Sequence, residues 1–497
     1  MHTIFFFQCS LQVFFLPFSM FKRTFSKAKI SETVMSINKP ISSNLDPPIN
    51  RNMRVLDRSF FSKTFPVVGV YFPDPKKIGL FLSKCRQDAL RVPNVPFIVK
   101  FNEAKDSQEE KLVLLNESIQ SLSQINSSLA PSTLEFIEAN KGVLKEHLLT
   151  LDYDFWKSEE ILKAILPDNL EEEIPSGFTR TGHIAHVNLK EEYKPYSEII
   201  GQVIMDKNPS ITTVVDKVDS IETTFRTFKM KVIAGEPNFM VEQRESDCLF
   251  TFDFSKVYWN SRLHTEHKRL VDLFKPHTAI CDVMAGVGPF AVPSGKKECF
   301  VFANDLNPES FKYLDINVSR NKVNKFVKVF NTDGRDFITQ AQNDLFNYSN
   351  THKFLTLNSR KKQRVSKDTT PQIKVPIPNF FSHYIMNLPD SAIEFVDAYV
   401  GLFTKAFPQL SIDEVKSLPN YLLPTINVHH FEKFSPNEEP TEEELHRRIH
   451  EKIKRLLSFN ISFEELHFHM VRKVSPTKPM FCISFQLPEE VAFSKSN

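Results

Sequence analysis

The spacing of hydrophobic residues predicts regular structure from about residue 50 onward. FPVVGVYF (65–72) is rich in β-branched and aromatic residues and predicts a strand, and KKIGLFLSKC (76–85) predicts a helix. The polar stretch 103–112 predicts a loop. In WKSEEILKAIL (156–166), four aliphatic residues fall on one face of a helix. We therefore expect an N-terminal domain over residues 50–165.

The next block predicts a small α+β unit over residues 166–255. GFTRTGHIAHVNL (177–189) alternates in part and predicts one strand, which a helix at 196–206 follows. Further strands are expected at 211–218, 225–235, 239–245 and 248–259.

From about residue 268 the pattern changes to strands that alternate with helices. Such alternation predicts a parallel, doubly wound sheet. The expected strands lie at 280–284 and 299–305, at the start of 328–338, and at 383–386, and the segment 425–434 precedes the last helix. The expected helices lie at 309–323, at the end of 328–338, at 390–403 and from Thr441 onward, and 291–297 is either a helix start or a turn. The last helix has a capping box, Thr441 with Glu444, and an apolar stripe made of Leu445, Ile449, Ile453, Leu456 and Leu457.

The chain ends with LHFHMVRKV and PMFCISFQL, which predict an antiparallel hairpin. A parallel sheet that ends in such a hairpin resembles the class I methyltransferases. We therefore expect an α/β fold in which residues 256–497 form a class I (Rossmann-like) methyltransferase domain. The stretch 351–380 is rich in Lys, Arg, Ser, Thr and Pro and predicts a disordered insertion. Its RKKQR (360–364) is either a solvated loop or a basic patch for phosphate contact or nuclear localisation.

The composition of the chain bears on whether it binds nucleic acid or a metal. The 62 Lys and Arg nearly balance the 60 Asp and Glu, so a nucleic-acid partner would need a local basic surface. The six cysteines form no CxxC pair and no cluster with zinc spacing, which predicts no metal and a reducing compartment. Glycine is scarce, with only 12 residues, so the pair Gly286 and Gly288 is informative.

Residues 1–49 carry two alternative interpretations. From Met20 the sequence is basic, bears Ser and Thr, and has no acid before Glu32, which is typical of mitochondrial presequences. Met35 would then be a second start for a cytosolic or nuclear form. The expected compartments are the mitochondrial matrix, the nucleus and the cytoplasm. The alternative is a disordered tail. We expect no membrane-spanning segment, because the apolar run from Ile4 to Phe18 is too short.

The glycines belong to a turn that predicts a nucleotide-type cofactor. GVGPFA (286–291) follows a strand, and Asp305 ends the next strand, where an acid accepts hydrogen bonds from a ribose diol. This arrangement predicts an adenosine and leaves open whether the cofactor is a dinucleotide or S-adenosylmethionine. Asp282, ahead of the glycines, and Asp333-Gly334, after a further strand, favour S-adenosylmethionine.

HYIMNLPDSAIEF (383–395) places polar residues at the carboxyl end of a core strand, where ligands lie in open α/β sheets. Asn387-Leu388-Pro389 resembles the Asn-Pro motif of methyltransferases that act on planar nitrogens. For Asp390 we expect the N-cap of the following helix rather than catalysis.

Together these segments resemble one family. The likeness is carried by DFSKVYWNSRLHTEHKRL, DVMAGVGPFAVP, ANDLNPES and MNLPDSA, by the DG pair 333–334, and by LDYDFW, GHIAHVNL, TTFRTFKMKVIAG and RKVSPTKPM. They are similar to eukaryotic and archaeal tRNA (guanine-37-N1)-methyltransferases, above all the fungal ones. The resemblance covers residues 50–497 apart from 351–380. It implies methyl transfer from S-adenosylmethionine to N1 of guanosine 37, which helps to prevent frameshifting.

The resemblance also implies roles for individual residues. Glu266 would be the base that removes the N1 proton, and Arg226 would stabilise charge on the guanine oxygen. Asn387 and Pro389 would shape the base site. The residues expected to contact the cofactor are His267, Asp282, Gly286, Gly288, Asp305, Leu306, Asp333, Gly334 and Asn387.

The expected partner is a tRNA with guanosine 37, bound by the two N-terminal regions with its target base flipped out, and the enzyme is expected to be a monomer without metal. Three alternatives remain at this point: an aminocarboxypropyl transferase of wybutosine synthesis, a nicotinamide-dependent dehydrogenase and a non-catalytic RNA-binding protein.

Overall fold

The structure is a computed structural model that describes residues 45–101, 110–218, 225, 229–358 and 372–495. Contacts divide the chain into Met1–Asp46 and Pro47–Asn497, and the second unit holds the whole fold described below. None of the helices in the described part of the chain combines the length and apolar character that a membrane crossing needs.

The first sheet is antiparallel, in the order β2-β3-β1-β4. Its strands are β1 (Lys63–Tyr71), β2 (Ile98–Phe101), β3 (Glu110–Leu114) and β4 (Val143–Leu151), and helices α1 (Lys76–Lys84), α2 (Ile125–Ser128) and α3 (Pro131–Ala139) accompany it. Val68, Val70 and Phe81 belong to its buried core. The strand at 65–72 and the helix at 76–85 are confirmed. The loop at 103–112 was wrong at its end, because β3 already begins at Glu110; residues 102–109 lie outside the described part.

The second sheet has the order β5-β6-β7-β8. It consists of β5 (Thr179–Thr181), β6 (Ile184–Val187), β7 (Thr213–Lys217) and β8 (Met230–Gly235), with α4 (Ser158–Ile165) and α5 (Ser197–Lys207) alongside. The single strand predicted at 177–189 was wrong. Gly182, at φ +58°, turns the chain back, so that Thr181 pairs with Ile184.

Strands β9 (Met240–Glu245) and β10 (Cys248–Asp253) form a separate hairpin. They contact the second sheet, because the backbone N–H of Gly182 donates to Gln243 Oε1 at 3.0 Å. They also pack on helix α8 (Pro308–Arg320): the backbone N–H of Thr251 donates to Asn317 Oδ1 at 2.8 Å, and Phe250 and Phe252 share a core with Leu314. The strand predicted at 248–259 was wrong at its end, because β10 ends at Asp253.

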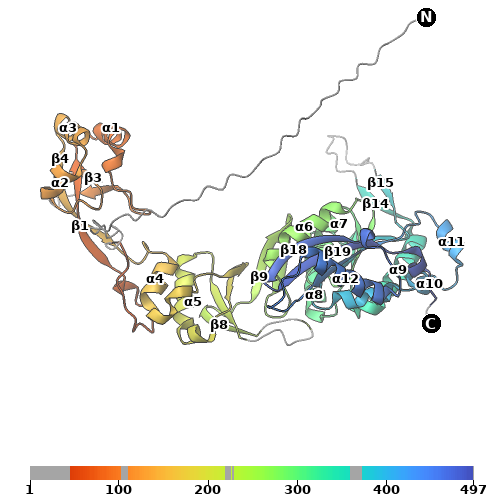
Figure 1. Ribbon diagram of the computed structural model, residues 1–497. Helices are drawn as coiled ribbons and strands as arrows, with labels where there is room; N and C mark the ends of the chain where they lie inside the picture. Colours follow the sequence, from red (N-terminus) through yellow and green to blue (C-terminus); the bar gives the residue numbers. More distant parts are fainter. Residues whose placement is uncertain (1–44, 102–109, 219–224, 226–228, 359–371, 496–497) are drawn as a thin grey trace, which may run out of the picture. The chain divides into compact units, whose positions relative to one another are not determined.

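The third sheet has seven strands in the order β13-β12-β11-β16-β17-β19-β18, coloured from green to blue in Figure 1. The first five strands pair in parallel and the last two antiparallel, as the sequence predicts. The strands are β11 (Ala279–Asp282), β12 (Phe300–Asn304), β13 (Val327–Phe330), β16 (Phe381–Met386), β17 (Thr425–Phe431), β18 (His467–Ser475) and β19 (Lys478–Gln486).

Helices cover both faces of this sheet because its strands alternate. Ala279 and Cys281 point to one face, where α9 (Gly334–His352), α10 (Leu402–Ala406) and α12 (Glu442–Leu457) pack. Ile280 points to the other, where α6 (His264–Leu273), α7 (Ala291–Lys296) and α8 pack. Short helices α11 (Ile412–Ser417) and α13 (Glu489–Ala492) complete the order. The capping box of Thr441 and Glu444 is confirmed.

Two expectations in this region were wrong. The single helix at 390–403 is a 3-10 helix, η8 (Ala392–Tyr399), and α10, and Gly401 at φ +72° separates them. The disordered insertion at 351–380 is ordered at both ends: α9 continues to His352, and β14 (Phe354–Asn358) pairs with β15 (Gln372–Pro376). Residues 359–371, with RKKQR, lie outside the described part.

Candidate active site

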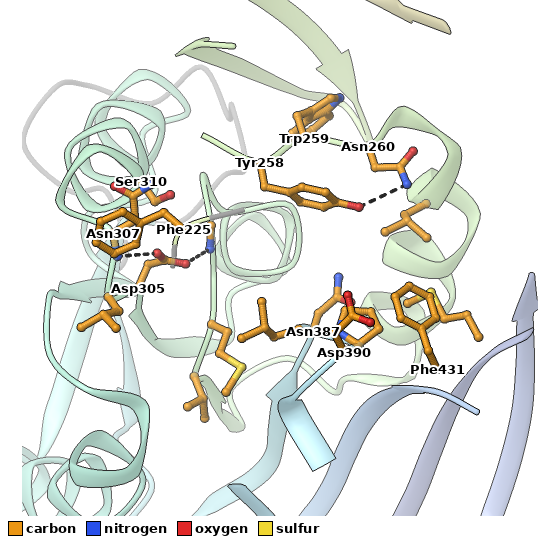
Figure 2. Close-up of a pocket in the computed structure, with 18 of the residues that line it drawn as sticks. Phe225, Tyr258, Trp259, Asn260, Asp305, Asn307, Ser310, Asn387, Asp390 and Phe431 are labelled. Atoms are coloured by element: carbon orange, nitrogen blue, oxygen red, sulfur yellow. Dashed lines mark hydrogen bonds between the residues drawn. The ribbon is translucent and has the colours of Figure 1, made fainter. Parts of the chain in front are cut away.

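A cavity of about 440 Å³ opens at the carboxyl ends of β11, β12 and β16. Figure 2 shows Asp305, Asn307 and Ser310 on one side of it and Asp390 and Phe431 on the other. The place is the one where open α/β sheets bind ligands, because the loops at this edge diverge to opposite faces.

The glycine turn forms one end of the cavity. Gly286 lies at φ +55°, and its backbone N–H donates to Asp305 Oδ2 at 2.8 Å. A side chain added at Gly286 would meet no atom within 4 Å, so the cavity side of this turn is open to a ligand. The N–H of Asn307 donates to Asp305 Oδ1 at 2.9 Å. Burial raises the pKa of Asp305, and these hydrogen bonds oppose that effect.

Gly288 packs against neighbouring helices beside the cavity. It lies at φ +98° and does not line the cavity. A Cβ there would come within 2.7 Å of Leu314 and 2.9 Å of Val292. Gly288 therefore allows the turn to pack closely against α7 and α8, and its predicted contact with the cofactor stays a prediction.

Other predicted residues do line this end. Leu306, Asp333 and Gly334 border the cavity. Asp333 is also the N-cap of α9, because its side chain accepts the N–H of Arg335 at 2.8 Å. Asp282 does not line the cavity and is fully buried. Neither of its carboxylate oxygens has a hydrogen-bond partner within the described part of the chain. Burial and the nearby charge of Asp305 raise the pKa of Asp282 to about 8.

The other end of the cavity holds the motif that follows β16. Asn387, Leu388 and Pro389 line it, and Asn387 Oδ1 is buried without a partner among the described residues. Such an oxygen is costly unless a ligand donates to it. Asp390 is not the N-cap that the sequence predicts: Ser391 has that position, and Asp390 Oδ1 instead forms ion pairs with Lys478 at 3.2 Å and Lys433 at 3.4 Å.

Glu266 and His267 do not reach the cavity. Glu266 is 2% exposed, and its carboxylate accepts two hydrogen bonds from Arg269, at 2.7 and 2.8 Å, and one from His429 at 2.8 Å. Burial would raise the pKa of Glu266, but these bonds outweigh it and hold the pKa at about 2. His267 is buried against Phe290 and pairs with Glu245 at 2.6 Å. Arg226 lies outside the described residues.

His429 adds a second positive charge to this network beside that of Arg269. Its Nδ1 lies 3.3 Å from the carbonyl oxygen of Met386 and its Nε2 2.8 Å from Glu266, so both ring nitrogens face acceptors. Burial lowers the pKa of His429, but Cys482 and Glu266 raise it to about 10. Glu266, His429 and Cys482 also bring three potential metal-ligand atoms within 4.8 Å of one another. Hydrogen bonds and charge account for this cluster, since Arg269 and His429 occupy both oxygens of the Glu266 carboxylate.

Several lining residues were missed by the sequence reasoning. Tyr258, Phe225 and Phe431 supply aromatic rings, and Arg472 and Lys478 supply charge. Asn260 Nδ2 lies 3.3 Å from the hydroxyl of Tyr258 (Figure 2). Tyr258 belongs to the segment DFSKVYWNSRLHTEHKRL on which the resemblance was based, and RKVSPTKPM contains Arg472 and Lys478, but neither segment contains a spacing rule that marks these side chains.

Comparisons with known proteins identify the family. A model of the TYW2 N-terminal domain matches residues 158–238, and one of the TRM5/TYW2 methyltransferase domain matches residues 241–368. A tRNA (guanine(37)-N(1))-methyltransferase of Candida albicans (strain WO-1) is 50% identical over 463 residues, which cover 91% of this chain and 100% of that protein. Its namesake from Saccharomyces cerevisiae is 46% identical over 508 residues, covering 95% and 99%. The chain belongs to the tRNA (guanine(37)-N(1))-methyltransferase family.

Solved structures agree with the fold of this methyltransferase. Wild-type Trm5b from Pyrococcus abyssi has a TM-score of 0.51 at 22% identity and covers 85% of this chain and 99% of its own. A complex of aTrm5 with tRNALeu has the same TM-score at 14% identity and the same coverage. The predicted class I methyltransferase fold is confirmed. The aminocarboxypropyl and dehydrogenase alternatives are not favoured, because the curated relatives at 41–50% identity are named methyltransferases.

Proposed function

We propose that this methyltransferase transfers the methyl group of S-adenosylmethionine to N1 of guanosine 37, the nucleotide 3′ of the anticodon in tRNA. The product is 1-methylguanosine, which helps to prevent frameshifting. The observation that carries the proposal is 50% identity over 91% of the chain to a protein of that name.

The glycine end of the cavity fits the cofactor. The Asp305 carboxylate can accept from a ribose diol, and the open side of Gly286 leaves room for a ligand against the backbone. Asp333 and Gly334 line the same cavity, and from the resemblance we propose that they contact the adenine edge. S-adenosylmethionine supplies an activated methyl group, so the protein needs to supply only position and proton transfer.

The opposite end fits a planar base. Tyr258 and Phe431 offer aromatic faces, and Asn387 Oδ1 offers an unused acceptor. Guanine presents N–H donors on the edge that carries N1, so this oxygen can hold that edge. A base of the anticodon loop must leave its stack to enter such a cavity, and stacking on aromatic rings offsets part of that cost.

For the proton at N1, we propose Glu266 as the base, from the resemblance. In the described state its carboxylate is held behind the cavity wall by Arg269 and His429. A carboxylate with a pKa of about 2 is a weak base. Its action therefore requires that entry of the guanine release it from one of these partners, which would raise its pKa.

The deciding experiment measures methyl transfer from labelled S-adenosylmethionine to unmodified tRNA. Substrates with guanosine 37 and with adenosine 37 are compared, and the nucleosides are analysed by mass. We expect 1-methylguanosine with the first substrate and no labelled product with the second. A heavier adduct on guanosine 37 would instead identify an aminocarboxypropyl transferase, and binding without any product would identify a non-catalytic RNA-binding protein.

A further inference from the structure

The hairpin of β18 and β19 turns Arg472 into the cavity by means of a β-bulge, and the regular alternation of β19 places Lys478 and Met480 on the same side. Met470 pairs with Phe481, and both pack in the apolar core on one face of the sheet. In a regular strand Arg472 would face the same core, because alternate residues share a face. The register shifts between Met470 and Arg472, so that Arg472 pairs with Met480 and both line the cavity. Such bulges re-aim side chains beside functional sites.

A second shift, between Lys473 and Ser475, lies at the tip of the hairpin. Val474 and Lys478 also line the cavity. A strand that presents an arginine to an apolar core would be strongly destabilised. The first shift therefore separates the core-facing part of this hairpin from the part that faces the cavity.

The two cations differ in how they are held. Lys478 lies 3.2 Å from Asp390 and 4.0 Å from the centre of the Phe431 ring, so it is fixed beside the base end of the cavity. Within the described part of the chain, the guanidinium of Arg472 has no hydrogen-bond or ion-pair partner. A planar guanidinium with no partner at a cavity wall is suited to bind an oxyanion through two parallel hydrogen bonds.

Further positive charge borders the same cavity. Arg262 and Lys217 line it, and burial together with the charge of Arg262 lowers the pKa of Lys217. Cations gathered around one cavity repel one another until an anion binds. A nucleotide within an RNA chain brings a phosphate on each side of its sugar, so it supplies two anions next to the base.

We propose that the bulged hairpin is a phosphate clamp, in which Arg472 and Lys478 each bind a phosphate next to the nucleotide whose base enters the cavity. Asp390 keeps Lys478 in position before RNA arrives. The clamp rests on the proposed function and adds to it how the target nucleotide is held. Arg472 and Lys478 are positioning residues: they orient the RNA and take no part in proton transfer.

The test compares Arg472→Ala and Lys478→Ala with Lys473→Ala, a matched control. Lys473 lies on the same strand, is exposed and does not line the cavity. Binding of guanosine-37 tRNA is measured over a range of salt concentrations, and KM and kcat are measured for both substrates. We expect R472A and K478A each to weaken tRNA binding about tenfold and to reduce the slope of log K against log salt by about one. The KM for S-adenosylmethionine should not change.

Three results would overturn the clamp. An equal loss with K473A would show diffuse attraction rather than a defined contact. A raised KM for S-adenosylmethionine with unchanged tRNA binding would assign Arg472 to the cofactor carboxylate. Unchanged tRNA affinity and salt slope in both variants would refute the clamp altogether.

Arg472→Lys keeps the charge and should retain the salt slope. Thermal melting of each variant shows whether a loss of binding comes from a lost contact or from unfolding. A wild-type protein that binds tRNA but does not methylate it would refute the proposed function separately.

Discussion

At the scale of the residue, Glu266 is both the proposed base and a member of a buried ion network with Arg269 and His429. Glu266→Gln should lower kcat by about 100-fold or more, because a positioned base contributes roughly that much, and should change the KM values little. It also removes the counter-charge of buried His429 and Arg269, which can cost about 3–5 kcal/mol of folding free energy. Thermal melting must therefore accompany the kinetics.

The matched control is Asp272→Asn on the same helix. Asp272 forms an exposed ion pair with Lys268 at 2.6 Å, so its loss should affect neither kcat nor melting appreciably. If E266Q melts at a lower temperature but keeps its kcat at a temperature where it is folded, Glu266 is a structural anion and not the base.

Asp282 gives a prediction about pH. Its pKa is raised from 3.8 to about 8 in the folded protein. Between these values the folded state binds more protons than the unfolded state, so this carboxyl group makes stability fall as pH rises from about 4 to about 8. In Asp282→Asn that contribution is absent. We expect the variant and the wild type to melt alike near pH 4, and the variant to melt higher at pH 8.

Thermal melting without cofactor at a series of pH values measures this difference. Parallel curves for the two proteins across the series would show that Asp282 is ionised in the fold and that its charge is compensated.

At the scale of the element, two glycines should respond in opposite directions. Gly401 separates η8 from α10 at φ +72°, and a Cβ there would lie 2.6 Å from the carbonyl oxygen of Ser494. Gly401→Ala should therefore destabilise the protein by about 1–2 kcal/mol or more. Gly79 lies inside α1 with nothing within 4 Å of its added Cβ, so Gly79→Ala should stabilise it by about 0.5–1 kcal/mol.

Denaturant unfolding at constant temperature gives both free energies. Each substitution adds one methyl group, so an effect of added volume would change both free energies of unfolding in the same direction. A change in the same direction for both variants would contradict the conformational explanation.

At the scale of the whole molecule, the sequence predicts two forms of the protein. The basic segment after Met20 should direct the full chain to mitochondria, and a chain that starts at Met35 should remain in the cytosol and nucleus. Fluorescent fusions at the C-terminus report the distribution. Replacing Lys22, Arg23, Lys27 and Lys29 with alanine is the control and should give the distribution of the shorter form. Identical distributions of the long and short chains would leave a tail without a targeting role.

The sequence by itself determined that the large sheet consists of parallel strands that alternate with helices and ends in an antiparallel hairpin, and it determined the position of the glycine turn. Local patterns carry this information: alternation decides which strand residues face each layer of helices, and few residues other than glycine tolerate the turn at Gly286. Asp305, Asp333 and Asn387 could be placed in the site because they follow strands whose carboxyl ends meet at one edge.

Only the tertiary structure decided which of the candidate residues share a cavity. Glu266 and His267 lie three and four residues after Leu263, which lines the cavity, yet contacts with His429 and Glu245 from distant segments hold them away from it. Arg472 lines the cavity because a register shift turns it to the other face of its strand, and Asp390 pairs with Lys478, which follows it by 88 positions in the sequence. Such partners are set by packing between segments far apart in the chain, so no local period or spacing records them.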